Sequence, residues 1–206
     1  MKRISLLILA LLASASIINA QVTKELHTEE GGFEWYLISN DDYEGVEDIR
    51  HKVIIPLSKK YTSVDYNDGF FVVEYDNEYE GLYSLTGKEL ISVKRKYESV
   101  NPMDNYISVE IGNYEGACDL TGKEIISPKR GYDSVLMSDN YYYVKKNGKE
   151  GACDQNGKEV VPPNYKGLIF SGGIFKALAV DGQFYPLNIV NTITCEESTA
   201  AGEPTR

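Results

Sequence analysis

Three segments of the sequence repeat one another at a constant spacing. They read EGLYSLTGKELI from residue 80, EGACDLTGKEII from residue 115 and EGACDQNGKEVV from residue 150, so that Gly81, Gly116 and Gly151 are 35 residues apart. A degenerate copy begins at Glu44-Gly45 and a truncated copy at Asp181-Gly182. A short fixed period is typical of repeat proteins, in which each unit buries its apolar surface against its neighbours. The sequence therefore predicts an array of about five units over residues 44–190.

Each unit has the pattern of a β-meander. In the unit around Gly151, tyrosine- and valine-rich or alternating stretches predict strands over residues 142–145, 150–154 and 158–161. Asn147-Gly148 and Asn156-Gly157 separate them and favour tight hairpin turns, because both residue types tolerate positive φ. Pro162 and Pro163 are expected to end the third strand, since proline cannot donate to a strand ladder. A further short strand is expected over residues 165–169.

The fold class predicted from these units is all-β, because no part of the chain after residue 20 shows a 3.6-residue apolar period. We expect tandem antiparallel hairpin or meander repeats in an open, twisted array. The alternative is a propeller-like ring, although a unit of 35 residues is shorter than a propeller blade of about 40 to 45 residues. The glycines that recur in the units are expected to be structural, namely Gly81, Gly87, Gly116, Gly122, Gly151 and Gly157.

The N-terminus has the pattern of a secretory signal peptide over residues 1–20. Lys2 and Arg3 precede an apolar run over residues 4–12, which is too short to span a bilayer, and Ala20 is a suitable residue before the cleavage site. Ala15 is an alternative cleavage position, and a buried N-terminal helix is an alternative interpretation. We expect an exported protein, periplasmic or extracellular, with no transmembrane segment after signal cleavage. Residues 21–43 are expected to be a lead segment and N-terminal cap, and residues 191–206 a disordered tail.

The composition argues against nucleic acid as a partner and is rich in tyrosine. The formal net charge is −10, which argues against nucleic acid because phosphate binding requires clustered positive charge. The chain has 16 Tyr against 6 Phe and 1 Trp. Tyrosine suits half-buried strands and wet interfaces, because its ring is apolar and its hydroxyl is polar.

The repeats resemble the WG-repeat family of bacterial proteins. The family pattern is matched twice, by Gly116, Asp119, Gly122-Lys123-Glu124, Ile125-Ile126, Pro128 and Tyr132, and by Gly151, Asp154, Gly157-Lys158-Glu159, Val160-Val161, Pro162 and Tyr165. The family's tryptophan is absent, since an acidic residue precedes each key glycine and the one tryptophan, Trp35, is followed by Tyr36. The resemblance implies an interaction module of β-repeats.

Charged residues recur at equivalent positions and form two stripes. The acidic stripe precedes the key glycines and consists of Glu44, Glu80, Glu115, Glu150 and Asp181. It could bind cations or a basic partner, but solvated turn residues that protect strand edges are the favoured interpretation. The basic stripe consists of Lys59-Lys60, Lys94-Arg95-Lys96, Lys129-Arg130 and Lys166. It could bind an anion, but a solvated face with weak ion pairs is favoured.

Tyrosines are the candidate contact residues. A row at equivalent positions consists of Tyr61, Tyr97, Tyr132 and Tyr165. Exposed rings in such a row could stack on sugars, with Tyr97 and Tyr132 as candidates, but rings that cap the core and bond a neighbouring loop are favoured. Tyr141, Tyr142 and Tyr143 are further candidates, because successive side chains in a strand point to opposite faces and at least one of the three is expected to be exposed.

The cysteines and the remaining motifs give no catalytic pattern. Cys118 and Cys153 are equivalent and are expected to be small buried hydrophobic residues. They could form a disulfide if the units were stacked edge to edge at about 4.8 Å, but not if sheets packed face to face at about 10 Å. A nucleophilic cysteine needs a basic neighbour and a histidine. The two histidines, His27 and His51, lie in the lead segment and the degenerate first unit, so the sequence pairs none of the cysteines, Cys195 included, with a catalytic partner.

We therefore expect a non-enzymatic module that binds another protein or a component of the cell envelope. No metal-ligand cluster, cofactor motif or phosphate-binding loop is present in the sequence. The alternatives are a carbohydrate-binding accessory protein that uses the repeated tyrosines, and an inhibitor or structural protein of the envelope without a small ligand.

Overall fold

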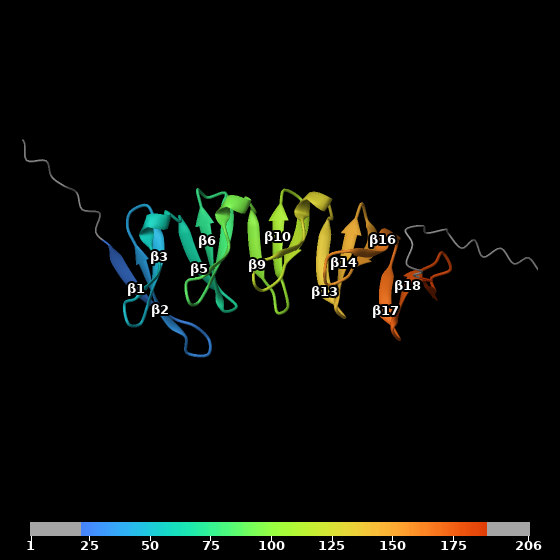
Figure 1. Ribbon diagram of the computed structural model, residues 1–206, viewed down its shortest axis with the longest axis horizontal. Coiled ribbons are helices and arrows are strands. Elements are labelled where there is room, and N and C mark those ends of the chain that lie inside the picture. Colours follow the sequence, from blue (N-terminus) through green and yellow to red (C-terminus); the bar gives the residue numbers. More distant parts are fainter. Residues whose placement is uncertain (1–21, 189–206) are drawn as a thin grey trace, which may run out of the picture. The chain divides into compact units, whose positions relative to one another are not determined.

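The computed structural model describes residues 22–188 and contains five antiparallel sheets, none closed into a barrel. The proposed signal peptide (1–20), the tail (191–206) and Cys195 lie outside the described residues. The described part is built from strands and three single-turn 3-10 helices (Figure 1). The prediction of an open array of antiparallel β-repeats is confirmed.

The strands follow one another in chain order within each sheet. Sheet A consists of β1 (Thr23–Thr28), β2 (Glu34–Ser39), β3 (Glu44–Asp48) and β4 (Val53–Ile55). Sheet B consists of β5 (Ser63–Asn67), β6 (Phe70–Tyr75), β7 (Tyr79–Ser84) and β8 (Glu89–Ile91). Sheet C consists of β9 (Ser99–Pro102), β10 (Ile107–Ile111), β11 (Tyr114–Cys118) and β12 (Glu124–Ile126). Sheet D consists of β13 (Ser134–Ser138), β14 (Tyr141–Lys146), β15 (Lys149–Cys153) and β16 (Glu159–Tyr165). Sheet E consists of β17 (Leu168–Ser171), β18 (Ile174–Leu178) and β19 (Phe184–Pro186).

The described residues divide into two compact units, with the boundary between Lys60 and Tyr61. The first unit contains sheet A and the 3-10 helix η1 (Leu57–Lys59). The lead segment supplies β1 and β2, half of this four-stranded sheet. Within this sheet, Glu47 is 8% exposed and pairs with Lys24 at 2.6 Å; this hydrogen bond lowers the pKa of Glu47.

In the second unit, sheets B to E pack face to face in succession. Adjacent residues of β11 show this, because Ala117 belongs to the core shared with sheet D, whereas Cys118 belongs to the core shared with sheet B. A third core lies between sheets D and E, around Val161 and Phe175. Figure 1 shows the four sheets in this order from green to orange. Sheets C and D are therefore buried on both faces, so each unit depends on its neighbours.

The turn glycines make this close stacking possible. Gly122 has φ +87°, and a Cβ atom there would lie 2.1 Å from the Leu90 carbonyl oxygen of the preceding sheet. Gly157 repeats the relationship, with a Cβ position 2.1 Å from the Ile125 carbonyl oxygen. A side chain at either position would prevent the sheets from approaching, and the positive φ would strain it.

The key glycines of the repeat occupy equivalent backbone positions. Each lies on the third strand opposite a valine, in the pairs Val73–Gly81, Val109–Gly116 and Val144–Gly151. A Cβ atom at Gly116 would lie 2.4 Å from the carbonyl oxygen of Ile126 in the fourth strand. The glycines are therefore needed because the fourth strand crosses the third at close range.

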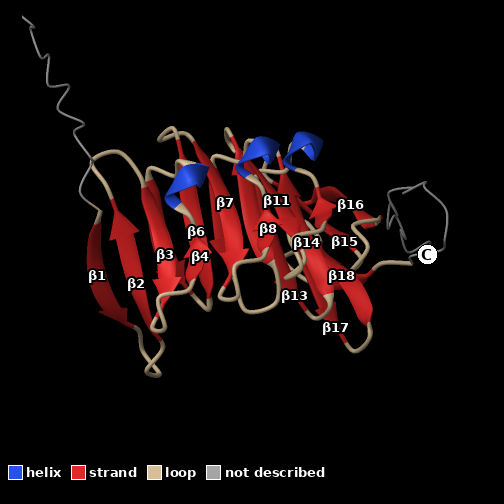
Figure 2. Cartoon of the chain, turned by 60° about the vertical axis from the view of Figure 1, so that its left-hand side comes forward, coloured by secondary structure: helices blue, strands red, loops and turns tan. Residues whose placement is uncertain are grey.

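The connection to the next sheet differs from the prediction in one unit. After the fourth strand, sheets B and C continue into η2 (Val93–Arg95) and η3 (Pro128–Arg130), which lie at the same end of their sheets (Figure 2). In sheet D the prediction that Pro162 and Pro163 end the strand is wrong, because β16 continues through both to Tyr165. The segment from Val161 to Tyr165 is two residues shorter than the equivalent segment from Ile126 to Tyr132, which leaves no room for a helical turn.

The stacking also decides the state of two cysteines. Cys118 and Cys153 are free thiols, and both are completely buried. They lie at equivalent positions in sheets that pack face to face, at a spacing of about 10 Å that is too long for a disulfide.

Candidate binding groove between sheets B and C

A carboxylate from each of sheets B, C and D covers the free edge of the next sheet. The side chain of Glu80 accepts a hydrogen bond from the Val100 N–H at 2.6 Å. Glu115 and Glu150 repeat this contact with the N–H groups of Val135 and Leu168, each at 2.8 Å. The residues that donate these hydrogen bonds lie on the first strands of sheets C, D and E. These are edge strands, whose outer N–H groups have no strand partner. These three members of the acidic stripe are half-buried structural residues that close strand edges.

The arginine that ends each of the helical turns η2 and η3 binds the next sheet, and so does the tyrosine two residues later. The Tyr97 hydroxyl donates to Glu124 at 2.6 Å, and the Tyr132 hydroxyl donates to Glu159 at 3.1 Å. The guanidinium group of Arg95 donates to the carbonyl oxygen of Gly122 at 2.7 Å, a contact that Arg130 repeats with Gly157. The arginines of the basic stripe are thus partly used within the protein.

The tyrosines predicted as contact residues serve the core. Tyr97 and Tyr132 are each 2% exposed, and burial raises the pKa of both hydroxyls. The expectation of an exposed ring in the run 141–143 is wrong. Tyr142 is 3% exposed, while Tyr141 and Tyr143 are half-buried against Phe175, with ring centroids 4.8 and 6.2 Å away. The alternation of faces is as predicted, but both faces of this sheet are covered by neighbours. The binding role of these residues stays a prediction.

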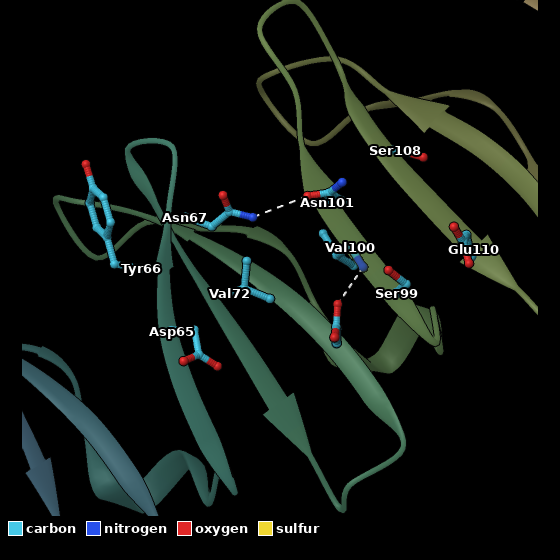
Figure 3. A pocket seen from close by; sticks show the side chains of 10 residues that line it. Asp65, Tyr66, Asn67, Val72, Ser99, Val100, Asn101, Ser108 and Glu110 are labelled. Carbon is cyan, nitrogen blue, oxygen red and sulfur yellow. Dashed lines mark hydrogen bonds between the residues drawn. The ribbon is translucent and has the colours of Figure 1, made fainter. Parts of the chain in front are cut away.

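A polar groove lies over β9, the edge strand of sheet C. Its volume is about 370 Å³. It is lined from sheet B by Asp65, Tyr66, Asn67, Val72 and Glu80, and from sheet C by Ser99, Val100, Asn101, Ser108 and Glu110. Figure 3 shows the two walls of the groove. The Asn67 side-chain amide donates to the Asn101 side-chain oxygen at 3.2 Å and links the two walls. Sequence analysis did not single out this site, because its walls come from separate repeats.

The groove carries uncompensated negative charge. Asp65, Glu80 and Glu110 line it, and no Lys, Arg or His within residues 22–188 forms an ion pair with any of them. Burial raises the pKa of Glu80, and so does the charge of the nearby carboxylates Glu74, Asp65 and Glu110. A positively charged group in the groove would relieve this repulsion.

Comparison among the repeats separates structural residues from those particular to this groove. The register aligns Val64, Val100 and Val135 as equivalent residues of the first strands, and Val73, Val109 and Val144 as equivalent residues of the second. The edge carboxylate and the serine before the first-strand valine recur at the next junction, where Glu115 and Ser134 occupy the positions of Glu80 and Ser99. Three other positions change, because Leu136, Tyr143 and Lys145 replace Asn101, Ser108 and Glu110. The concentration of acids is therefore a property of the junction between sheets B and C rather than of the fold.

The groove lacks an available aromatic platform. Its one aromatic residue, Tyr66, packs edge-on against Phe71 with ring centroids 6.1 Å apart. Figure 3 shows the Tyr66 ring directed away from the rest of the lining. A sugar ring would therefore find hydrogen-bonding groups in the groove but no ring face for stacking.

A second groove, of about 480 Å³, contains part of the basic stripe. It is lined by Lys94, Arg95, Tyr97, Ile111, Glu124, Ser127 and Lys129. The Glu124 carboxylate lies among the cations and accepts from Tyr97, and Arg95 is bound to Gly122. Its charges are therefore partly balanced, in contrast to the acidic groove.

Residues 22–188 show neither a metal-binding cluster nor a membrane-spanning helix. They contain no cluster of three or more His, Cys, Asp or Glu side chains suited to a metal ion. In the same range, no helix has the length and apolar character needed to cross a bilayer.

Comparisons with known proteins identify the repeat. The family described as "WG containing repeat" matches residues 116–149 and 151–178. Comparison with curated proteins found no match. Among solved structures, the computationally designed Ika8 protein is 14% identical, with 80% of this chain and 57% of that chain covered and a TM-score of 0.32. The designed Ika4 protein is 16% identical, with 63% and 91% covered and a TM-score of 0.33. HIRA(644-1017) is 12% identical, with 64% and 46% covered and a TM-score of 0.32.

Proposed function

We propose that this chain, whose residues 116–149 and 151–178 match the WG containing repeat family, is an exported, non-enzymatic binding module whose acidic groove holds a basic segment of a partner protein. The observation that carries the proposal is the set of three carboxylates, Asp65, Glu80 and Glu110, that have no basic partner among the described residues. A lysine or arginine side chain in the groove would supply the missing charge and several hydrogen-bond donors.

The chemistry of the groove favours a protein over a glycan as the ligand. Asp65 and Asn101 are exposed at its rim, where they can accept hydrogen bonds from an incoming guanidinium or ammonium group. Charge complementarity of this kind also speeds association with a basic partner, because the chain as a whole is acidic. Carbohydrate binding would rely on stacking, and the Tyr66 ring is packed against Phe71.

The cellular location of this interaction would be the periplasm, the cell envelope or the exterior of the cell. The basic start and the short apolar run before Ala20 support export. N-terminal sequencing of the protein recovered from a bacterial host tests this part, with Gln21 as the expected first residue. A chain that keeps Met1 and remains in the cytoplasm would contradict it.

The binding proposal is tested with a fluorescent octa-arginine peptide as the probe and anisotropy as the measurement. The mature chain is expected to bind it, and the double variant Asp65→Asn, Glu110→Gln is expected to weaken binding about tenfold at low salt, because two charge-assisted contacts are lost.

The matched control is the double variant Asp76→Asn, Asp139→Asn. It removes the same charge from two exposed hairpin positions with φ of 60° and 51°, which asparagine tolerates. Equal weakening by the two double variants would show attraction by net charge alone and would contradict the proposal. Binding to neutral polysaccharide that survives 0.5 M salt would favour the carbohydrate alternative over it.

A further inference from the structure

The junction between sheets D and E is an apolar counterpart of the acidic groove. Leu136 and Ile169 occupy on β13 and β17 the positions that Asp65 and Asn101 occupy on β5 and β9. Leu136 is 58% exposed and Ile169 is 38% exposed. The same register position thus changes along the stack from acid to amide to two exposed aliphatic side chains.

Leu136 is part of a local apolar surface. It lies directly opposite Tyr143 on the neighbouring strand, and the Tyr143 ring packs against Phe175 of the next sheet. Between this surface and the acidic groove lies the junction of sheets C and D, where Lys145 takes the position of Glu110. Successive junctions therefore offer negative charge, a positive charge and an apolar contact.

The spacing of the junctions matches an extended peptide. Stacked sheets are about 10 Å apart, so the acidic groove and the apolar junction are separated by two spacings, or about 20 Å. An extended chain rises about 3.3 Å per residue and covers this distance in about six residues. The two sites are therefore within reach of one short segment of a partner.

From this arrangement we infer that the partner segment binds in an extended conformation across the first strands of sheets C, D and E, parallel to the direction in which the sheets stack. Its basic residue occupies the acidic groove, and an apolar residue about six positions away contacts Leu136 and Ile169. The inference rests on the proposed function and adds the sequence pattern by which the partner is recognised. The commitment to a partner segment follows from charge complementarity, because the acidic groove at one end of this row requires a basic group.

The inference is tested by selecting a random twelve-residue peptide library on the mature chain. Enriched peptides are expected to carry Lys or Arg and an aliphatic or aromatic residue about six positions apart. The variant Leu136→Ser is expected to weaken the best peptide about fivefold, since one partly exposed leucine contact is lost. The variant Leu120→Ser is the control, because Leu120 is 41% exposed on a turn of sheet C away from the row.

The outcomes separate this inference from the proposed function. Basic peptides without an apolar preference, whose affinity is unchanged by Leu136→Ser and by Ile169→Ser but lost in Asp65→Asn, Glu110→Gln, would overturn the inference and leave the proposed function standing. Peptides that bind regardless of the two groove acids would overturn both. Self-association of the chain that is abolished by Leu136→Ser would assign the apolar junction to a second copy and would also overturn the inference.

Discussion

The side chain of Glu115 accepts a hydrogen bond from the backbone N–H of Val135, 2.8 Å away across the junction of two sheets. Val135 lies on the first strand of its sheet, so this N–H group has no strand partner of its own. An uncovered edge strand is a template for pairing with other chains. The acid before the repeat glycine therefore joins the sheets and protects an edge in a single contact.

Loss of this carboxylate should destabilise the protein. The change Glu115→Ala leaves the Val135 N–H unsatisfied and is expected to lower the free energy of unfolding by about 1 to 3 kcal/mol. Glu115→Gln keeps an oxygen acceptor and should cost less. Urea denaturation of both variants, with the exposed Asp104→Ala as a control, measures the difference. A loss as large for glutamine as for alanine would contradict the assigned contact.

The turn glycines should differ in how well they tolerate alanine. Gly122→Ala combines a positive φ with a Cβ position 2.1 Å from the Leu90 carbonyl oxygen, so a loss above about 3 kcal/mol in the free energy of unfolding is expected. At Gly148, φ is +73° but no atom lies within 4 Å of the Cβ position, so Gly148→Ala should cost about 1 to 2 kcal/mol. Thermal denaturation compares the two, and equal losses would show that close approach of the sheets is not the constraint.

Tyr83 should make stability depend on alkaline pH. Burial raises the pKa of its hydroxyl from 10.0 to about 12, and the hydroxyl bonds Tyr61 and Glu89 at 2.8 Å each. Since the folded-state pKa is the higher one, the contribution of this group is complete below pH 10 and is lost as the pH rises through 12. Tyr83→Phe should be less stable than the wild type at pH 8, and the gap should narrow between pH 10 and 12. Parallel curves over this range in urea denaturation would contradict the shift.

The two buried thiols should remain reduced and unreactive in the folded protein. Burial raises the pKa of Cys118 to about 11 and also raises that of Cys153, so little thiolate forms at neutral pH. Alkylation followed by mass spectrometry should label both only after denaturation. Rapid labelling of either residue in the native state, or a Cys118–Cys153 disulfide, would contradict face-to-face stacking of their sheets.

Much of the fold could be predicted because the asparagine and glycine residues that form turns and close contacts act through their local backbone conformation. Asn147-Gly148 forms the predicted hairpin turn with φ of 52° and 73°, and Gly116 recurs in one backbone setting with Gly81 and Gly151. The path through Pro162 and Pro163 was mispredicted, since the length of that connection rather than proline chemistry decides whether a helical turn forms.

The candidate site could not be predicted in the same way. Strand alternation places Tyr142 and Tyr143 on opposite faces of the sheet, but it cannot show that neighbouring sheets cover both faces. The groove joins Asp65 to Glu110 across two repeats, and neither residue lies in the repeated segments that contain the key glycines. Its acidic character becomes visible only when equivalent junctions are compared, because Lys145 then stands out as the counterpart of Glu110.

The most direct test of the acidic groove as the binding site is photo-crosslinking in living cells. A photoreactive amino acid in place of Asn101, inside the groove, is compared with one in place of Leu120. Position 101 is expected to capture a single protein through a basic segment, and the crosslink should disappear when Asp65→Asn and Glu110→Gln are added. The same crosslinks from position 120, or capture at position 101 that persists without the two acids, would contradict the proposed function.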